Sequence, residues 1–328
     1  MRAISLPAVP YEATAQRPDW ADLPAAVRTA IADRLGSPVV AARTARGGFT
    51  QGFTAVLTTA AGDEHFVKAA ALTDLPHLAD WYAREAALTA ALPPAVPAPR
   101  PRWTATLAGH YVLCAEAVPG ARMPALPWRP DELTATLAAL AATAAALREP
   151  PAALTALGLP RLSDFARADL STWAPVAAGH APMPPAPALA RARLRDLVAL
   201  EQTFIGYADS PAVIHSDLRA DNVVLDGAGA AWLCDWSWPC HGVPWFDTAI
   251  LLVTAFASGL DADALFAGHP TTRGAPPDAL DAVLAAGCGY WFARASDAPP
   301  DGSPYLRAHQ RWSGEQALAW LAARRGWA

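Results

Sequence analysis

The alternation of hydrophobic and polar positions changes its period along the chain. Between residues 39 and 116, short segments with apolar residues at every second position predict strands with one buried face. A helical period interrupts the strands at 74–92 and precedes them at 21–35, where Gly36 follows as a C-cap. The five expected strands, all antiparallel, are 39–44, 53–59, 65–70, 103–107 and 111–116.

Beyond residue 118 the helical period dominates. Proline-rich stretches are expected to form a linker at 150–160 and a surface loop at 175–187, and residues 1–20 a loosely docked arm. The pattern predicts a β-rich N-lobe over residues 1–118 and a helical C-lobe over 119–328. The expected helices of the C-lobe are 131–148, 188–208, 244–258, 277–295 and 303–323.

Composition narrows the class of protein. The net charge of −5 gives no support to a nucleic-acid partner. The longest apolar runs, at 133–147 and 249–260, are too short or too interrupted by threonine to span a membrane. The N-terminal residues lack a basic region followed by an apolar core, so we expect no signal peptide. The four cysteines are scattered without a CxxC pair, which indicates buried thiols in a reducing cytoplasm, with Cys240 and His241 as a remote alternative metal pair.

The candidate chemistry lies in residues 214–238. His215 and Asp217 open this stretch, and Asn222 follows five residues after the aspartate. Two short apolar runs around a glycine-rich turn then predict a hairpin that ends at Asp235. Two carboxylates and one amide on such a loop and hairpin suit a divalent cation and a reacting hydroxyl group.

Two residues of the chain are unique. Lys68 is the only lysine, although lysine and arginine together number 25, and Asn222 is the only asparagine. Arginine does not replace a compact ammonium group that must lie between phosphates, and asparagine offers a metal a neutral oxygen. Chance survival explains either residue alone but explains both together poorly.

The segment before the candidate loop contains further parts of a phosphate site. Residues 46–52 read RGGFTQG, a turn that can lie over a phosphate chain but lacks the GxxxxGK[ST] pattern of a Walker A loop. A buried lysine needs a carboxylate partner, and Glu85 on the 74–92 helix is the candidate for Lys68. The alternative for Glu85 is a solvated position, but the single lysine upstream favours the ion pair.

With these motifs the chain resembles the aminoglycoside phosphotransferase family, relatives of the protein kinases that phosphorylate hydroxyl groups of small molecules. The resemblance implies a bilobal, protein-kinase-like α+β fold with a small antiparallel β-sheet N-lobe and a mostly helical C-lobe. It spans residues 39–255. The matching residues are Gly47-Gly48-Phe49, Phe66-Val67-Lys68, Glu85, the 116–120 hinge, His215-Ser216-Asp217-Leu218 through Asn222, Cys234-Asp235-Trp236 and the run from Gly242 to Asp247.

The resemblance also implies roles. Asp217 accepts or orients the proton of the acceptor hydroxyl, and Asn222 and Asp235 hold Mg²⁺. The nucleotide is ATP, or alternatively GTP, and the acceptor is a small molecule with a hydroxyl group. The residues expected to contact the nucleotide or to support that contact are Gly47, Gly48, Lys68, Glu85, Glu116 and Val118.

The chain departs from the family pattern at two places. The second carboxylate stands in Asp-Trp-Ser rather than Asp-Phe-Gly, which argues against the flexible switch of regulated protein kinases. Arg219 follows Asp217 by two residues, and two hypotheses for it are balanced: it contacts the transferred phosphoryl group, or it is a surface residue paired with Asp221. His215 is expected to support the loop, and Asp247 to anchor the loop's backbone.

The acceptor stays open, as does the choice between a monomer and a homodimer. From residue 257 onward seven acidic residues balance six arginines, so the sequence does not require a polycationic acceptor, and a macrolide, a sugar or an amino alcohol suits it equally. Two alternatives remain: a pseudokinase that binds nucleotide or metabolite without turnover, and a nucleotidyltransferase or protein kinase on the same scaffold. The short segment 235–247 argues against a protein substrate.

Overall fold

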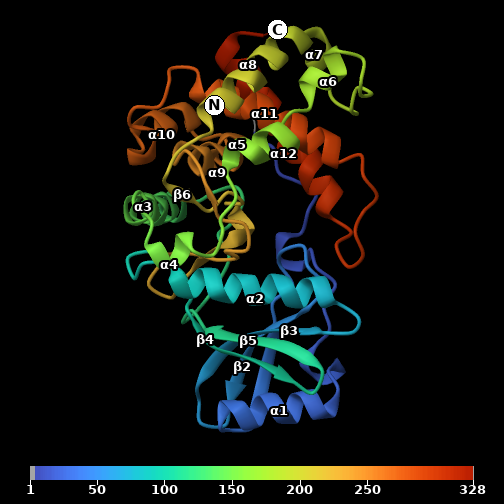
Figure 1. The fold of residues 1–328 in the computed structure, drawn as a ribbon, viewed down its shortest axis with the longest axis vertical. Coiled ribbons are helices and arrows are strands. Elements are labelled where there is room, and N and C mark those ends of the chain that lie inside the picture. The colour runs from blue at the N-terminus through green and yellow to red at the C-terminus, as the bar shows by residue number, and fades with distance from the viewer. Residues whose placement is uncertain (1–3, 328) are drawn as a thin grey trace.

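The structure is a computed structural model that describes residues 4–327, arranged as a sheet lobe and a helical lobe (Figure 1). All five strands of the main sheet are antiparallel, in the order β1-β2-β3-β5-β4. The helix α1 (Ala25–Leu35) packs on the sheet, and α2 (Pro76–Ala91) lies between the sheet and the helical lobe. The strands are β1 (Val39–Thr44), β2 (Phe53–Thr59), β3 (Glu64–Ala71), β4 (Pro101–Leu107) and β5 (His110–Glu116).

The strands form where the period of two predicts them, because one face of each strand has a core to cover. Phe53, Leu57 and Val67 are almost completely buried against the apolar side of α1. The β4–β5 hairpin turns at Ala108 and Gly109, both with positive φ (45° and 80°), the backbone that a two-residue turn between twisted strands requires.

The helical lobe is built around α9 and α11, whose residues are almost all buried. Two short strand pairs flank the candidate loop 215–222 in this lobe: β6 (Val213–Ile214) with β9 (Cys240–His241), and the predicted hairpin of β7 (Val223–Leu225) and β8 (Ala231–Leu233). The helices are α3 (Pro130–Ala146), α4 (Ala152–Thr155), α5 (Leu162–Ala168), α6 (Trp173–Ala177), α7 (Ala188–Ala192), α8 (Leu194–Tyr207), α9 (Trp245–Ala257), α10 (Ala262–Gly268), α11 (Ala279–Arg294) and α12 (Leu306–Arg325).

The helix predicted at 188–208 is in fact two helices. The backbone leaves the helical conformation at Arg193 (φ −109°, ψ 18°), between α7 and α8. The guanidinium group of Arg193 packs over the ring of Trp327, 5.6 Å from its centroid, a tertiary contact that no local pattern reveals. The linker predicted at 150–160 likewise contains the helix α4, and the first helix begins at Ala25 rather than at residue 21.

The sequence predicts a loosely docked arm over residues 1–20, of which residues 1–3 lie outside the described residues. For residues 4–20 the prediction is wrong, because hydrogen bonds fix the arm to both lobes. The backbone N–H of Ser5 donates to Ala257 O over 2.9 Å, in the helical lobe. The backbone N–H of Ala15 donates to Arg46 O, also over 2.9 Å, in the sheet lobe. The arm therefore runs from the helical lobe to the sheet lobe (Figure 1), held by hydrogen bonds that proline content alone does not predict.

The cysteines match the expectation of thiols better than that of a metal pair. All four are free, and Cys114, Cys240 and Cys288 are buried, whereas Cys234 is half-buried. No group of three or more histidine, cysteine or acidic side chains within residues 4–327 could hold a metal ion. In that same part of the chain, no helix has the length and apolar character needed to cross a bilayer.

Gly52 and Gly206 provide a matched pair of glycine-to-alanine substitutions. A Cβ at Gly52 would overlap Tyr82 Oη and lie 2.5 Å from Leu78 Cδ2, whereas a Cβ at Gly206 in α8 meets nothing within 4 Å. We expect Gly52→Ala to lower the free energy of unfolding by roughly 1–3 kcal/mol. Gly206→Ala should raise it by about 0.5 kcal/mol, because alanine restricts the unfolded chain. Urea unfolding measures both, and equal effects at the two positions would contradict the packing described for Gly52.

Candidate active site

The loop between β6 and β7 is held from the helical core by Asp247, near the start of α9. Its two carboxylate oxygens accept hydrogen bonds from the backbone N–H groups of His215 (2.8 Å) and Ser216 (2.9 Å). Burial raises the pKa of Asp247 to about 6, although both hydrogen bonds favour the charged form, and the group is therefore ionised at neutral pH. The predicted anchoring of the loop backbone by Asp247 is confirmed.

His215 connects the two carboxylate-bearing segments of the site. Its side chain is completely buried, and Nε2 lies 2.8 Å from Cys234 O, directly before Asp235. Its ring also packs against Trp236, with centroids 4.6 Å apart. These contacts match the expected structural role of His215.

The backbone is left-handed at both carboxylates of the predicted site. Asp217 directly follows such a residue, and Asp235 is one itself. Among the described residues, positive φ at a non-glycine position occurs at Ala108 in its hairpin and otherwise only at Ser216 (64°) and Asp235 (60°). Such backbone costs energy and persists where surrounding contacts enforce it, which is frequent at functional sites. At Ser216 those contacts are Asp247 and the hydrogen bond from Ser216 Oγ to Trp238 O.

Asp217, Arg219 and Asn222 form one hydrogen-bonded group. Asn222 donates its side-chain N–H to Asp217 O over 2.7 Å, which leaves Oδ1 of the amide for another partner. Arg219 Nη1 lies 2.5 Å and 2.6 Å from the two carboxylate oxygens of Asp217. The side chains of these three residues, which span five positions of the sequence, thus meet at Asp217.

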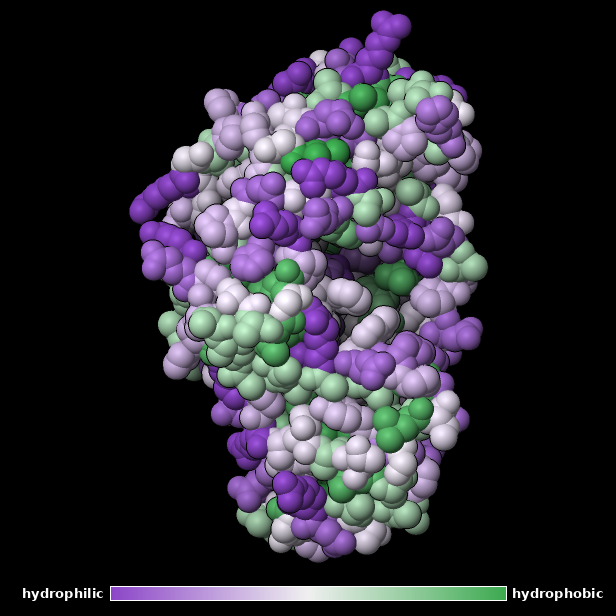
Figure 2. Space-filling model, in the orientation of Figure 1, coloured by the Kyte–Doolittle hydropathy of each residue, from purple (hydrophilic) through white to green (hydrophobic). Residues whose placement is uncertain are grey.

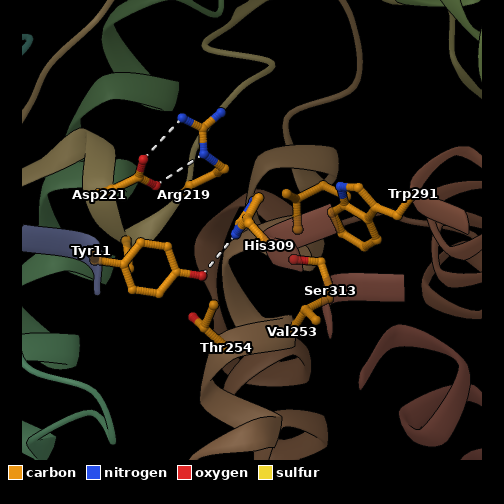
Figure 3. Close-up of a pocket in the computed structure, with 10 residues that line it drawn as sticks. Tyr11, Arg219, Asp221, Val253, Thr254, Trp291, His309 and Ser313 are labelled. Atoms are coloured by element: carbon orange, nitrogen blue, oxygen red, sulfur yellow. Dashed lines mark hydrogen bonds and ion pairs between the residues drawn. The ribbon is translucent and has the colours of Figure 1, made fainter. Parts of the chain in front are cut away.

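Of the two hypotheses for Arg219, the pairing with Asp221 is confirmed, the surface position is wrong, and contact with a transferred phosphoryl group stays a prediction. Arg219 pairs with Asp221 through Nε (2.9 Å) and Nη2 (3.1 Å), but it holds Asp217 as well and is far from a surface residue. The side chain of Asp221 is almost completely buried, and Phe49 of the glycine-rich loop covers the guanidinium at 5.4 Å. Figure 3 shows Arg219 and Asp221 beside a small cavity of about 20 Å³, room for roughly one water molecule.

Lys68 and Glu85 form the expected ion pair, and Glu85 is not solvated. Lys68 Nζ lies 2.7 Å and 2.6 Å from the two carboxylate oxygens, and both side chains are nearly buried. Burial alone would lower the pKa of Lys68, but the negative charges of Glu85 and Asp235 outweigh it and raise that pKa. The charge of Lys68 is thus retained inside the protein.

Asp235 faces this lysine from the helical lobe. Burial opposes its ionisation, but Lys68, a hydrogen bond from Ser237 Oγ (2.7 Å) and Arg219 together hold the pKa of Asp235 below its usual range. The surface in Figure 2 is hollowed where the sheet lobe meets the helical lobe, and these charged groups lie along that junction. An ionised carboxylate and the Oδ1 of Asn222 are hard oxygen ligands, so the donor set fits Mg²⁺.

The remaining predicted residues lie around this junction. Gly48 has φ of 82°, which favours glycine, and a Cβ at Gly47 would come within 3.1 Å of Met123 Sδ. Glu116 accepts a hydrogen bond from the backbone N–H of Arg100 (3.0 Å), and its own backbone N–H donates to Arg100 O (2.9 Å). Val118 is buried at the hinge between the lobes. The roles assigned to these residues stay predictions.

The sequence did not predict that residues near both ends of the chain lie beside the candidate site. Tyr11 in the arm and His309 in α12 line the cavity beside Arg219, joined by a hydrogen bond of 2.8 Å from Tyr11 Oη to His309 Nδ1 (Figure 3). Burial, with the nearby charge of Arg219, lowers the pKa of His309 to about 4, so its ring is neutral at pH 7. No motif marks either residue, and only a completed fold brings them to the catalytic loop.

Three solved structures illustrate the similarity of this fold to known proteins. The macrolide 2′-phosphotransferase MphH from Brachybacterium faecium is 19% identical, with a TM-score of 0.56 over 88% of this chain and 96% of that one. Aminoglycoside phosphotransferase APH(4)-Ia, in a ternary complex with AMP-PNP and hygromycin B, is 16% identical, with a TM-score of 0.59 over 92% and 100%. A GDP complex of aminoglycoside 2′-phosphotransferase-IIIa is 15% identical, with a TM-score of 0.58 over 91% and 96%.

These similarities show a bilobal, kinase-like α+β fold, as the sequence predicted. A comparison with curated protein sequences gives no match. A family model, described as the phosphotransferase enzyme family, matches residues 42–295. That match covers most of the chain, and the chain belongs to this family.

Proposed function

We propose that this protein transfers the γ-phosphate of ATP or GTP to a hydroxyl group of a small molecule. The observation that carries the proposal is the convergence of four predicted residues from distant parts of the chain. Lys68 approaches Asp235 closely enough for their charges to shift each other's pKa, and Asp217 and Asn222 are hydrogen-bonded beside them. Together they supply a retained positive charge, a metal-binding pair and a base, the groups that phosphoryl transfer needs.

In the proposed reaction the acceptor oxygen bonds to the γ-phosphorus while the bond to the β-phosphate oxygen breaks. The proton of the acceptor hydroxyl passes to a carboxylate oxygen of Asp217, and the nucleoside diphosphate leaves. Lys68, held by Glu85, orients the nucleotide phosphates. Asn222 and Asp235 would hold Mg²⁺, which supplies charge neutralisation on the phosphates when bound.

One observation favours the alternative of binding without turnover. Arg219 already occupies both carboxylate oxygens of Asp217. A carboxylate has about four lone-pair sites, however, so Asp217 can accept a hydroxyl proton while it stays paired. The pairing also places the guanidinium beside the proton acceptor, where negative charge on a transferred phosphoryl group develops. We therefore keep turnover as the proposal and assign Arg219 to the stabilisation of that charge.

The comparisons support a nucleotide and leave the acceptor open. The similar structures include complexes with AMP-PNP and with GDP, and their acceptors are macrolides and aminoglycosides. Near the catalytic loop of this chain, the acidic residues Asp221 and Asp169 are already paired with Arg219 and Arg294. That pairing leaves little unbalanced negative charge for a polycation, so neutral hydroxylated molecules belong in any acceptor panel.

Turnover of ATP and GTP against a panel of aminoglycosides, macrolides, sugars and amino alcohols tests the proposal. We expect phosphorylation of at least one acceptor, and a decrease in kcat of about 10²–10⁴-fold in Asp217→Asn because the proton acceptor is lost. Nucleotide affinity should stay within about twofold. Tight nucleotide binding with no turnover on any acceptor would favour the pseudokinase, and absence of nucleotide binding would reject both readings.

Arg219→Ala tests the role of this arginine. If the guanidinium stabilises the transferred phosphoryl group, kcat should decrease by about 10²-fold or more while nucleotide affinity is unchanged. Asp221→Asn is the matched control, because it breaks the buried ion pair and keeps the arginine. A loss of kcat in Asp221→Asn as large as that in Arg219→Ala would show that the pair has only a structural role.

The buried pair of Lys68 and Glu85 gives a test that separates stability from catalysis. Glu85→Leu leaves a buried, unpaired ammonium and should lower the free energy of unfolding by roughly 3–5 kcal/mol. The double variant Lys68→Met, Glu85→Leu should recover most of that stability in urea unfolding but none of the turnover. Arg167→Ala, which breaks the exposed pair with Asp164, is the control and should change stability by less than about 1 kcal/mol.

A further inference from the structure

The N-terminal arm contacts the glycine-rich loop directly. Thr14 Oγ1 donates to Gly48 O over 2.6 Å, and the backbone N–H of Ala15 donates to Arg46 O over 2.9 Å. The arm lies before residue 42, where the family match begins, so nothing in that match assigns it a role. Tyr11 anchors it to His309 beside the catalytic loop (Figure 3).

Arg17 makes the most extensive of these contacts. Its guanidinium donates to Ala45 O (2.5 Å) through Nη1, to Thr50 O (2.8 Å) through Nε and to Thr50 Oγ1 (3.0 Å) through Nη2. Ala45 precedes the glycine-rich loop and Thr50 lies near its end, so the planar guanidinium bridges the two sides of the loop. A single arginine therefore closes the loop at its base.

The position of this bridge coincides with the proposed phosphate site. Arg17 Nη2 lies 3.3 Å from the place where a Cβ of Gly48 would be, so the guanidinium is beneath the loop backbone. Burial lowers the pKa of Arg17, and the negative charges of Asp235 and Glu85 act against that lowering. The same two carboxylates raise the pKa of Lys68. Arg17 thus adds a second, permanent positive charge to the region of Lys68.

The helical lobe holds the same loop from the other side. Ser303 Oγ donates to Phe49 O over 2.6 Å, and the backbone N–H of Gln16 donates to Gly302 O over 2.8 Å. A glycine-rich loop loses much conformational freedom when it is fixed, and preformed contacts remove that loss from the binding step. Contacts from the arm and from the helical lobe together therefore fix the loop.

We propose that Arg17 is a positioning residue of the nucleotide site, which holds the glycine-rich loop closed over the phosphates from the N-terminal arm. This inference rests on the proposed phosphotransferase function. It predicts an effect on the nucleotide and not on the acceptor, because the bridged loop belongs to the sheet lobe. It also predicts that a lysine at this position is a poor substitute, since an ammonium group cannot reach both sides of the loop with the same planar geometry.

The test compares Arg17→Ala, Arg17→Lys and Thr50→Val with Arg43→Ala, which removes an exposed arginine from the neighbouring strand β1. The probe is a fluorescent ATP analogue, titrated into each protein at matched salt and magnesium concentration. We expect the nucleotide Kd to rise about tenfold in Arg17→Ala and about two- to fourfold in Thr50→Val. The rise in Arg17→Lys should lie between these two values. The KM for the acceptor should stay unchanged, and Arg43→Ala should match the wild type.

Amide hydrogen exchange of residues 46–52 without nucleotide gives a second readout. Faster exchange there in Arg17→Ala, with the exchange of α9 and α11 unchanged, is expected if the residue orders the loop. An unchanged nucleotide Kd, or an equal rise in the KM values of nucleotide and acceptor, overturns the inference. If Arg17→Ala does not fold, Thr50→Val decides alone by the same criteria. Absence of nucleotide binding by the wild type instead rejects the proposed function.

Discussion

The two hydrogen bonds from the backbone of His215 and Ser216 to Asp247 are the constraint on which the candidate site depends. They join the loop that bears Asp217 to the first turn of α9, the most buried helix of the C-terminal half. A left-handed serine is costly, and a buried carboxylate that accepts two N–H groups offsets that cost. The position of the proposed base is thus set by the packing of a helix 30 residues further along the chain.

The position of Asp235 depends on the loop that bears Asp217, because His215 in that loop contacts both neighbours of Asp235. Its ring contacts Cys234 O and Trp236 on either side of Asp235, which is itself left-handed. A displacement of the loop that bears Asp217 would therefore also displace Asp235, the proposed metal ligand. These contacts give the histidine at the start of the motif a structural role.

The sequence predicted the parts of the site that chemistry restricts to one residue type. Lys68 and Asn222 are unique in the chain, and the structure brings both to the junction of the lobes with Glu85 and Asp235. The strands were equally predictable, because their period follows from one buried face. Local pattern could not predict the break at Arg193, which follows a contact with Trp327 at the other end of the chain.

The prediction for the arm was wrong, and the pairing of Arg219 with Asp217 was not predicted, for a related reason. Prolines exclude regular structure but say nothing about hydrogen bonds to distant segments, and residues 4–17 find their partners in both lobes. The pairing of Arg219 with both Asp217 and Asp221 depends on the loop conformation that Asp247 imposes. In both cases the deciding contact is non-local.

The contacts of the arm and the glycine-rich loop divide into those within the sheet lobe and those that cross to the helical lobe. The bonds of Arg17 and Thr14 join the arm to the glycine-rich loop, so they survive if both move with the sheet lobe. Contacts of the loop and arm with the helical lobe include those of Gln16, Tyr11 and Ser303. Ser5 and Phe49 add further contacts with the helical lobe, through Ala257 O and through the guanidinium of Arg219. A separation of the lobes would therefore break contacts of both the arm and the loop with the helical lobe, whereas the bonds from Arg17 and Thr14 to the loop could stay intact.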